Sequence, residues 1–176
     1  NFDPAKKYPL ILEIHGGPSL AYGPGFSAEF QRFAAEGYVV FFDNHRGSSS
    51  YGEEFSMLLH NKYSSEYDFA DHDSGVDAMI ELGFVDENNL FITGGSAGGI
   101  AAAYSIGLTT RFNAAGVIKP IVNWLSKSLY ADSSTGQLRN QFPGFPWDHV
   151  DHFWKRSPMS LVGNVKTPTL LMTGEQ

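Results

Sequence analysis

The chain has 176 residues, of which 42% are hydrophobic, so it can bury one substantial core and its length favours a single domain. Its 19 acidic and 12 basic side chains give a formal net charge of -7, which argues against nucleic acid or an anionic membrane surface as a partner. Because the chain has no cysteine, it has no disulfide, no thiolate metal ligand and no thiol nucleophile.

The first predicted element is a strand. Residues 9–15 (PLILEIH) form an apolar run too short for a helix, and Gly16, Gly17 and Pro18 follow it as a loop. Four later runs share this character: residues 38–43, 90–94, 114–122 and 169–173. Near-continuous apolar runs of this length are typical of parallel strands that are covered on both faces.

Three helical patterns alternate with these strands. Residues 27–36 and 68–82 carry apolar side chains at helical spacing, and residues 96–108 are rich in alanine. Residues 44–65 and 132–146 are rich in small polar residues, Gly or Pro, and we expect them to be excursions over the sheet. The alternation predicts an α/β fold, and no apolar run approaches the roughly 20 residues that span a bilayer.

Residues 94–98 (GGSAG) match the nucleophile-elbow pattern G-x-S-x-G. Small residues around the central serine permit the strained turn that exposes its hydroxyl above a sheet. The pattern alone also fits a glycine-rich turn, but here an apolar strand (LFIT) runs into it and an alanine-rich helix runs out of it. The sequence therefore predicts Ser96 as a nucleophile, supported by Gly94 and Gly98.

A second motif, His15-Gly16-Gly17-Pro18, follows the first predicted strand. Its glycines allow backbone N–H groups to point at a developing oxyanion, and we expect Gly17 and Ala97 to supply the two donors. The alternative is an ordinary Gly-Pro turn beside a hydrogen-bonded histidine. Both motifs occur in the order that the oxyanion interpretation requires, which favours that interpretation, with His15 and Gly16 as supporting residues.

Four segments together carry a family resemblance: HGGP, NHRGSSSYGEEF, the helix at residues 71–81 leading to GFVDENNLFITGGSAGG, and FWKRSPMSLVGNVKTPTLLMTGE. This series resembles the prolyl oligopeptidase superfamily of serine peptidases, in its acylaminoacyl-peptidase and dipeptidyl-aminopeptidase branch. The resemblance covers residue 8 to the last residue. It implies an α/β-hydrolase catalytic domain with a mainly parallel sheet, helices on both faces and no cofactor. In the family a β-propeller precedes this domain, and no propeller sequence is present here.

The resemblance also implies that a peptide or acyl-peptide carbonyl acylates Ser96. In α/β-hydrolases the triad follows the order serine, acid, histidine, with the acid just after the strand that here is residues 169–173. We therefore expect the acid and the histidine beyond Gln176, and the last strand and helix of the fold to be missing from this partial domain. The 176-residue chain alone is then expected to be inactive and to self-associate through an exposed sheet edge.

Acid and histidine residues inside the chain are weaker candidates for the triad. Asp148, His149, Asp151 and His152 precede the last strand and fit the acidic first turn of a short helix better than a triad or a metal site. Glu175 is a carboxylate near the expected place of the acid. A second acidic group begins the helix at residues 68–82, and we predict no metal there; its members are Asp68, Asp71, His72 and Asp73.

Substrate-binding candidates are Arg46, Tyr51 and Trp124. Arg46 is suited to a substrate carboxylate or carbonyl, but a salt bridge that anchors its loop is the stronger interpretation. Trp124 belongs to a group of aromatic residues that line an apolar pocket or pack in the core; the others are Tyr130, Phe142, Phe145 and Trp147.

Three functions remain open from the sequence. The leading hypothesis is hydrolysis of short peptides through an acyl-enzyme on Ser96. A carboxylesterase is the first alternative, because the same elbow and oxyanion loop serve esters. The second is a non-catalytic folded module, because a serine without its base is a poor nucleophile.

Overall fold

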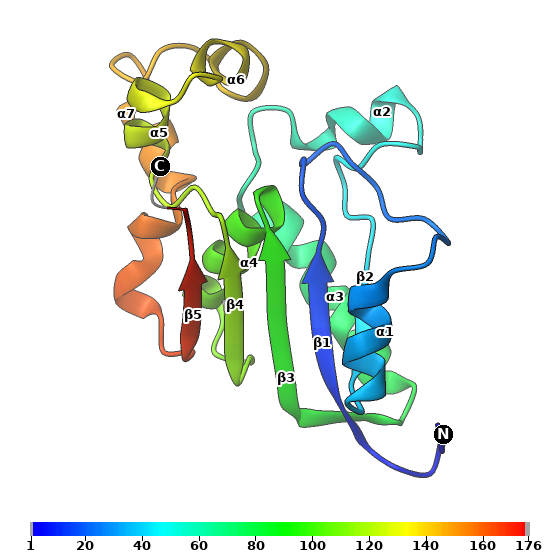
Figure 1. Cartoon of the computed structure of the whole chain (residues 1–176). Helices are drawn as coiled ribbons and strands as arrows, with labels where there is room; N and C mark the ends of the chain where they lie inside the picture. The colour runs from blue at the N-terminus through cyan, green and yellow to red at the C-terminus, as the bar shows by residue number, and fades with distance from the viewer. Residues whose placement is uncertain (1, 175–176) are drawn as a thin grey trace.

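A computed structural model describes residues 2–174, and within them five strands form one parallel sheet in the order β2-β1-β3-β4-β5 (Figure 1). The strands are β1 (Tyr8–Ile14), β2 (Val39–Phe42), β3 (Val85–Gly95), β4 (Ala114–Ile118) and β5 (Thr169–Met172). Every neighbouring pair is parallel. The predicted α/β fold with a mainly parallel sheet is confirmed.

The helices lie on both faces of this sheet. Figure 1 shows α1 (Ala28–Ala35) in front of the sheet, and α3 (Glu66–Glu81) and α4 (Ala97–Leu108) behind it. The remaining helical segments are short: α2 (Glu53–Ser56), η1 (Met57–Leu59), α5 (Trp124–Tyr130), α6 (Ser134–Gln141), α7 (Val150–Lys155) and η2 (Pro158–Asn164). Both predicted excursions therefore contain short helices, α2 and η1 in the first and α6 in the second.

The core is centred on β1, β3 and α4. Leu10, Leu12 and Ile14 of β1 and Leu90 and Ile92 of β3 are almost fully buried. Helix α4 is hydrophobic all round and buried along nearly its whole length, as expected for a helix enclosed by other elements. The register pairs Ile14 with Gly94, so the ends of β1 and β3 meet where both sequence motifs begin.

Several element boundaries differ from the sequence predictions for identifiable reasons. Strand β3 begins at Val85, because Val85 pairs with Tyr8 before a register shift that leaves extra residues in β3 ahead of the pair Leu10 and Leu90. Strand β4 ends at Ile118, because Lys119 has a φ of 50° and leaves the extended conformation. Helix α3 begins at Glu66, because Ser65 and Asp68 form a capping box.

Strand β5 departs from the prediction of strands covered on both faces. All four of its residues are exposed, including Leu170, Leu171 and Met172. It is the edge strand of the described sheet and pairs only with β4 there. Within residues 2–174, none of the helices combines the length and the apolar character needed to cross a membrane.

Candidate active site

Ser96 occupies a strained turn between β3 and α4. Its φ of 58° and ψ of -118° place a non-glycine residue at positive φ, a conformation that costs free energy and that clusters at functional sites. The Ser96 amide donates to the carbonyl oxygen of Ile118 at 2.9 Å, which ties the turn to the end of β4. Ser96 is exposed, whereas the next four residues are buried.

The glycines around Ser96 are required by close backbone contacts. A Cβ on Gly94 would lie 2.5 Å from the carbonyl carbon of Gly98, and a Cβ on Gly98 would lie 1.9 Å from the carbonyl oxygen of Ile14. Real Cβ atoms do not approach backbone this closely. The motif thus has glycine at these positions because the ends of β1 and β3 and the start of α4 approach at backbone distance.

The loop after β1 lies directly beside the serine. A Cβ on Gly16 would lie 3.3 Å from the carbonyl oxygen of Gly95 and 3.6 Å from Cβ of Ser96. Gly17 is exposed and has a φ of 122°, a conformation that favours glycine. Among the described residues, neither the Gly17 nor the Ala97 amide donates a hydrogen bond to another described residue. Within residues 2–174, the site therefore combines an exposed serine with two backbone N–H groups that have no hydrogen-bond partner.

His15 is buried under this loop and makes contacts through both ring nitrogens. Nδ1 lies 2.7 Å from the carbonyl oxygen of Gly16, and Nε2 lies 2.9 Å from Oγ of Ser48. The ring stacks on that of His45 at a centroid distance of 4.7 Å. Burial lowers the pKa of His15, so the ring is neutral near neutral pH.

Tyr63 contacts the first residue of α4 from the excursion before α3. Its hydroxyl donates to the carbonyl oxygen of Ala97, and its side chain is almost fully buried, which raises its pKa well above the usual value. The ring also stacks on His45 at 6.0 Å. We did not identify Tyr63 from the sequence, because an aromatic residue in a polar segment gives no local sign of a contact made 34 residues away.

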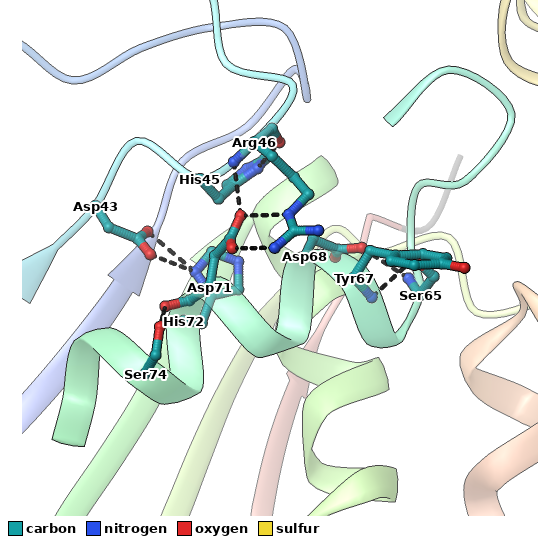
Figure 2. Close-up of polar contacts among 9 residues, drawn as sticks. All are labelled: Asp43, His45, Arg46, Ser65, Tyr67, Asp68, Asp71, His72 and Ser74. Carbon is teal, nitrogen blue, oxygen red and sulfur yellow. Dashed lines mark hydrogen bonds and ion pairs between the residues drawn. The ribbon is translucent and has the colours of Figure 1, made fainter. Parts of the chain in front are cut away.

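Arg46 forms a salt bridge with Asp71 of α3. Its Nε donates to Oδ2 of Asp71 at 2.8 Å, its Nη2 donates to Oδ1 at 2.6 Å, and its backbone amide adds a third bond to Oδ2 at 2.8 Å (Figure 2). Hydrogen bonding to Asp71 raises the pKa of Arg46. This bidentate pair is the loop-anchoring salt bridge, and it occupies the Nε–Nη2 edge of the guanidinium.

Two other ionisable residues at the start of α3, His72 and Asp68, also have structural partners. Nδ1 of His72 lies 2.9 Å from a carboxylate oxygen of Asp43, and Asp68 accepts from both the amide and the hydroxyl of Ser65 (Figure 2). Burial raises the pKa of Asp68 to about 6. Within residues 2–174, no three His, Asp or Glu side chains are grouped so as to hold a metal ion.

The candidate pocket aromatics divide into two sets. Trp124 and Phe142 are buried; the Trp124 ring meets Phe142 edge-on, and Phe142 stacks on Phe153 at a centroid distance of 4.0 Å. Tyr130 is 89% exposed, Trp147 is 65% exposed and Phe145 is 52% exposed. A pocket of about 300 Å³ lies at this excursion; its lining includes Leu138, Arg139, Phe142, Pro143 and Phe145. Trp124 is thus in the core rather than at this pocket.

Within the described part of the chain, the remaining candidate residues make no hydrogen bond to Ser96 or to the Gly16-Gly17 loop. Tyr51 is exposed, and its hydroxyl accepts from Nδ2 of Asn44 at 2.8 Å. Asp151 lies in the first turn of α7, as predicted, whereas Asp148 and His149 precede the helix, and Nε2 of His152 lies 3.2 Å from Nη1 of Arg156. Glu175 lies outside the described residues. Among residues 2–174, no histidine or carboxylate is hydrogen-bonded to Ser96.

Comparisons with known proteins agree on one family. The model of the prolyl oligopeptidase family matches residues 24–176. An uncharacterized peptidase of Bacillus subtilis, YuxL, is 38% identical over 170 residues, which cover 96% of this chain and 26% of that protein. The acylamino-acid-releasing enzyme of Arabidopsis thaliana is 32% identical over 174 residues, which cover 94% of this chain and 23% of the enzyme.

Solved structures give the same result. The acylaminoacyl peptidase of Pyrococcus horikoshii superposes with a TM-score of 0.90 at 29% identity, over 97% of this chain and 28% of the peptidase. A puromycin-hydrolyzing peptidase of Mycobacterium tuberculosis superposes with a TM-score of 0.88 at 26% identity, over 96% of this chain and 26% of that peptidase. The chain therefore spans about a quarter of the length of the proteins that it matches.

Proposed function

The chain belongs to the prolyl oligopeptidase family of serine peptidases, and we propose that its protein hydrolyses peptide or acyl-peptide bonds through an acyl-enzyme formed on Ser96. The observation that carries this proposal is the exposed, strained Ser96 with the Gly16-Gly17 loop beside it. The acylamino-acid-releasing and acylaminoacyl peptidase relatives support short peptides with a blocked N-terminus as the substrate class.

In the proposed reaction, Oγ of Ser96 attacks the carbonyl carbon of the substrate while a histidine takes the hydroxyl proton. The carbonyl oxygen becomes an oxyanion that accepts hydrogen bonds from the Gly17 and Ala97 amides. Collapse of the intermediate breaks the C–N bond, and the histidine returns the proton to the leaving amine. Water then attacks the Ser96 ester by the same route and releases the acid. Loss of one oxyanion donor typically lowers kcat by about 10²–10³-fold.

The base and its acid partner complete the proposal. Since no described histidine is hydrogen-bonded to Ser96, we place both in the segment that follows β5 in the full-length protein, in the triad order of the fold. The lack of a described histidine bonded to Ser96 also supports the competing proposal, that the chain is a non-catalytic module. Turnover by the 176-residue chain alone would exclude the non-catalytic module.

Kinetics on the full-length protein test the proposal and separate it from the carboxylesterase alternative. We expect an acetylated aminoacyl anilide to be cleaved with a higher kcat/KM than a p-nitrophenyl ester of similar size, and Ser96→Ala to abolish both activities. Ser126→Ala, a surface change in α5, serves as the matched control and should leave both unchanged. Anilide cleavage that persists in Ser96→Ala would exclude Ser96 as the nucleophile, and cleavage of the ester alone would favour the esterase.

The edge of β5 supports a further part of the proposal, self-association between copies of the 176-residue chain. Three exposed apolar side chains lie on this edge strand, and an unpaired strand edge is a template for another chain. Sedimentation at micromolar concentration should show species larger than a monomer, and Leu171→Lys should reduce them. A compact monomer at all concentrations would contradict this part.

A further inference from the structure

One peptide group links His15 to the proposed oxyanion site. The carbonyl of Gly16 and the N–H of Gly17 belong to the same planar amide, and His15 contacts that carbonyl through Nδ1 at 2.7 Å. We propose that His15, held in one tautomer by Ser48, is a positioning residue that aims the Gly17 N–H at the oxyanion. This inference rests on the proposed function and extends it to two residues that do not touch the substrate.

The tautomer of His15 follows from its partners. A carbonyl oxygen can only accept a hydrogen bond, so Nδ1 must carry the proton that is donated to Gly16. In the neutral ring Nε2 is then an acceptor, and the Ser48 hydroxyl donates to it at 2.9 Å. A hydroxyl that donates to Nε2 disfavours the other tautomer, in which Nε2 would carry the proton.

Ser48 is itself fixed in place. It is completely buried, its amide donates to the carbonyl oxygen of His45 at 3.0 Å, and its carbonyl accepts from Oγ of Ser56 at 3.1 Å. The rings around His15 restrict it further, because His45 stacks on one face at an interplanar angle of 14° and Tyr22 lies edge-on at 5.4 Å. The Nε2 end of the imidazole is therefore held by a neighbour that is itself fixed, and the ring is packed between His45 and Tyr22.

The loop needs such a restraint because its own residues supply little. Gly16 and Gly17 have no side chains, and glycine has the largest backbone freedom of any residue. Rotation of the Gly16-Gly17 amide plane would change the direction of the Gly17 N–H relative to Ser96, whose Cβ lies beside Gly16. A hydrogen bond to the carbonyl fixes this plane, and it also polarises the amide so that its N–H becomes a better donor.

Two substitutions of similar size separate this role from simple core filling. In His15→Asn the side-chain amide nitrogen can reach the place of Nδ1 and keep the bond to Gly16, whereas in His15→Gln the longer amide reaches toward Ser48. In the full-length protein we expect His15→Gln to lower kcat by about 10–50-fold with KM within about twofold, a smaller loss than the 10²–10³-fold cost of a deleted donor. His15→Asn should recover most of that loss. His60→Gln, at an exposed position, is the control for removal of a histidine.

A transition-state analogue gives a readout that core damage alone would not produce. A peptidyl trifluoromethyl ketone forms an oxyanion on reaction with serine, so its affinity should fall in His15→Gln by the same factor as kcat/KM, as expected for a group acting on the transition state. Ser48→Ala removes only one oxygen atom and should lower kcat by a smaller factor, about 3–10-fold, again with little change in KM. Equal kcat values for His15→Asn and His15→Gln, or losses confined to KM, would overturn the proposal.

The tautomer is measurable without any activity. Ring-nitrogen NMR on ¹⁵N-histidine-labelled full-length protein, with the His15 signal assigned by its loss in His15→Asn, should show Nδ1–H and an unprotonated Nε2. An Nε2–H tautomer would overturn the positioning role even in an active enzyme. An inactive wild-type protein in which Ser96 is unreactive would instead overturn the proposed function, and the positioning role with it.

Discussion

Two regions at the carboxyl end of the sheet are built in different ways. Around Ser96 and Gly16 the contacts are between backbone atoms, and a single Cβ at Gly98 would collide with the carbonyl of Ile14 at 1.9 Å. In residues 124–147 aromatic side chains make many of the contacts, and several of these rings remain exposed. The first region has little freedom in residue type, so its sequence is diagnostic. The second includes positions such as Gly136, where an added Cβ meets no atom within 4 Å, so its residue types say less about its arrangement.

Glycine substitutions should show this difference most strongly. Gly98→Ala is expected to prevent folding or to cost more than about 4 kcal/mol, because its Cβ would overlap backbone that cannot move independently. Gly136→Ala in α6 meets no atom within 4 Å and should stabilise the helix by about 0.5–1 kcal/mol. Denaturant unfolding measures both, and equal effects would contradict the contrast.

The second prediction concerns the pH dependence of the buried region. Burial raises the pKa of Glu13 in β1 from 4.5 to about 7, so the folded state binds a proton that the unfolded state has lost. This contribution to stability is complete below pH 4.5 and is lost as the pH rises through about 7. Glu13→Gln should therefore raise the unfolding free energy at pH 8 relative to wild type, by up to about 3 kcal/mol. If the unfolding free energies of wild type and Glu13→Gln changed with pH in the same way, the prediction would be wrong.

The third prediction compares the loss of one tyrosine hydroxyl in each of the two regions. Tyr63→Phe removes the buried hydrogen bond to the Ala97 carbonyl and should cost about 1–2 kcal/mol, since a buried acceptor loses a donor. Tyr130→Phe removes a hydroxyl from an 89% exposed side chain and should change stability by less than about 0.5 kcal/mol. Thermal unfolding of both variants in the same buffer measures the two losses of stability. A larger loss for Tyr130→Phe than for Tyr63→Phe would contradict the prediction.

The smallest stability effect is expected at the exposed aromatics. Phe145 and Trp147 stack on each other at 4.6 Å but remain more than half exposed, so Phe145→Ala should cost only about 0.5–1 kcal/mol. If the neighbouring pocket receives the acyl side of the substrate, the same change should raise KM several-fold in the full-length protein, because Phe145 lines that pocket. A large loss of stability without a change in KM would assign this ring to folding instead.

Local patterns predicted the fold where one residue type is dictated by its immediate surroundings. The apolar runs of β1 and β3 and the alanine-rich α4 identified the sheet and the helix behind it, and the apolar spacing over residues 27–36 identified α1. The glycine motifs located Ser96 and its neighbouring loop because backbone approaches this close leave no room for a Cβ at Gly94 and Gly98.

Contacts between distant side chains were not predictable in this way. The pairing of His72 with Asp43 joins residues 29 apart, and that of His15 with Ser48 joins residues 33 apart, and neither leaves a periodic signal. The exposure of β5 was also missed, because its apolar residues resemble those of a covered strand. The separation of buried Trp124 from exposed Trp147 depends on how short helices fold back on the core.

The central claim is that Ser96 is the nucleophile, and active-site labelling tests it most directly. The full-length protein treated with a fluorophosphonate should gain one adduct, which peptide mass spectrometry should place on Ser96, and Ser96→Ala should gain none. An adduct on another residue, or no adduct on a folded full-length protein, would contradict the account.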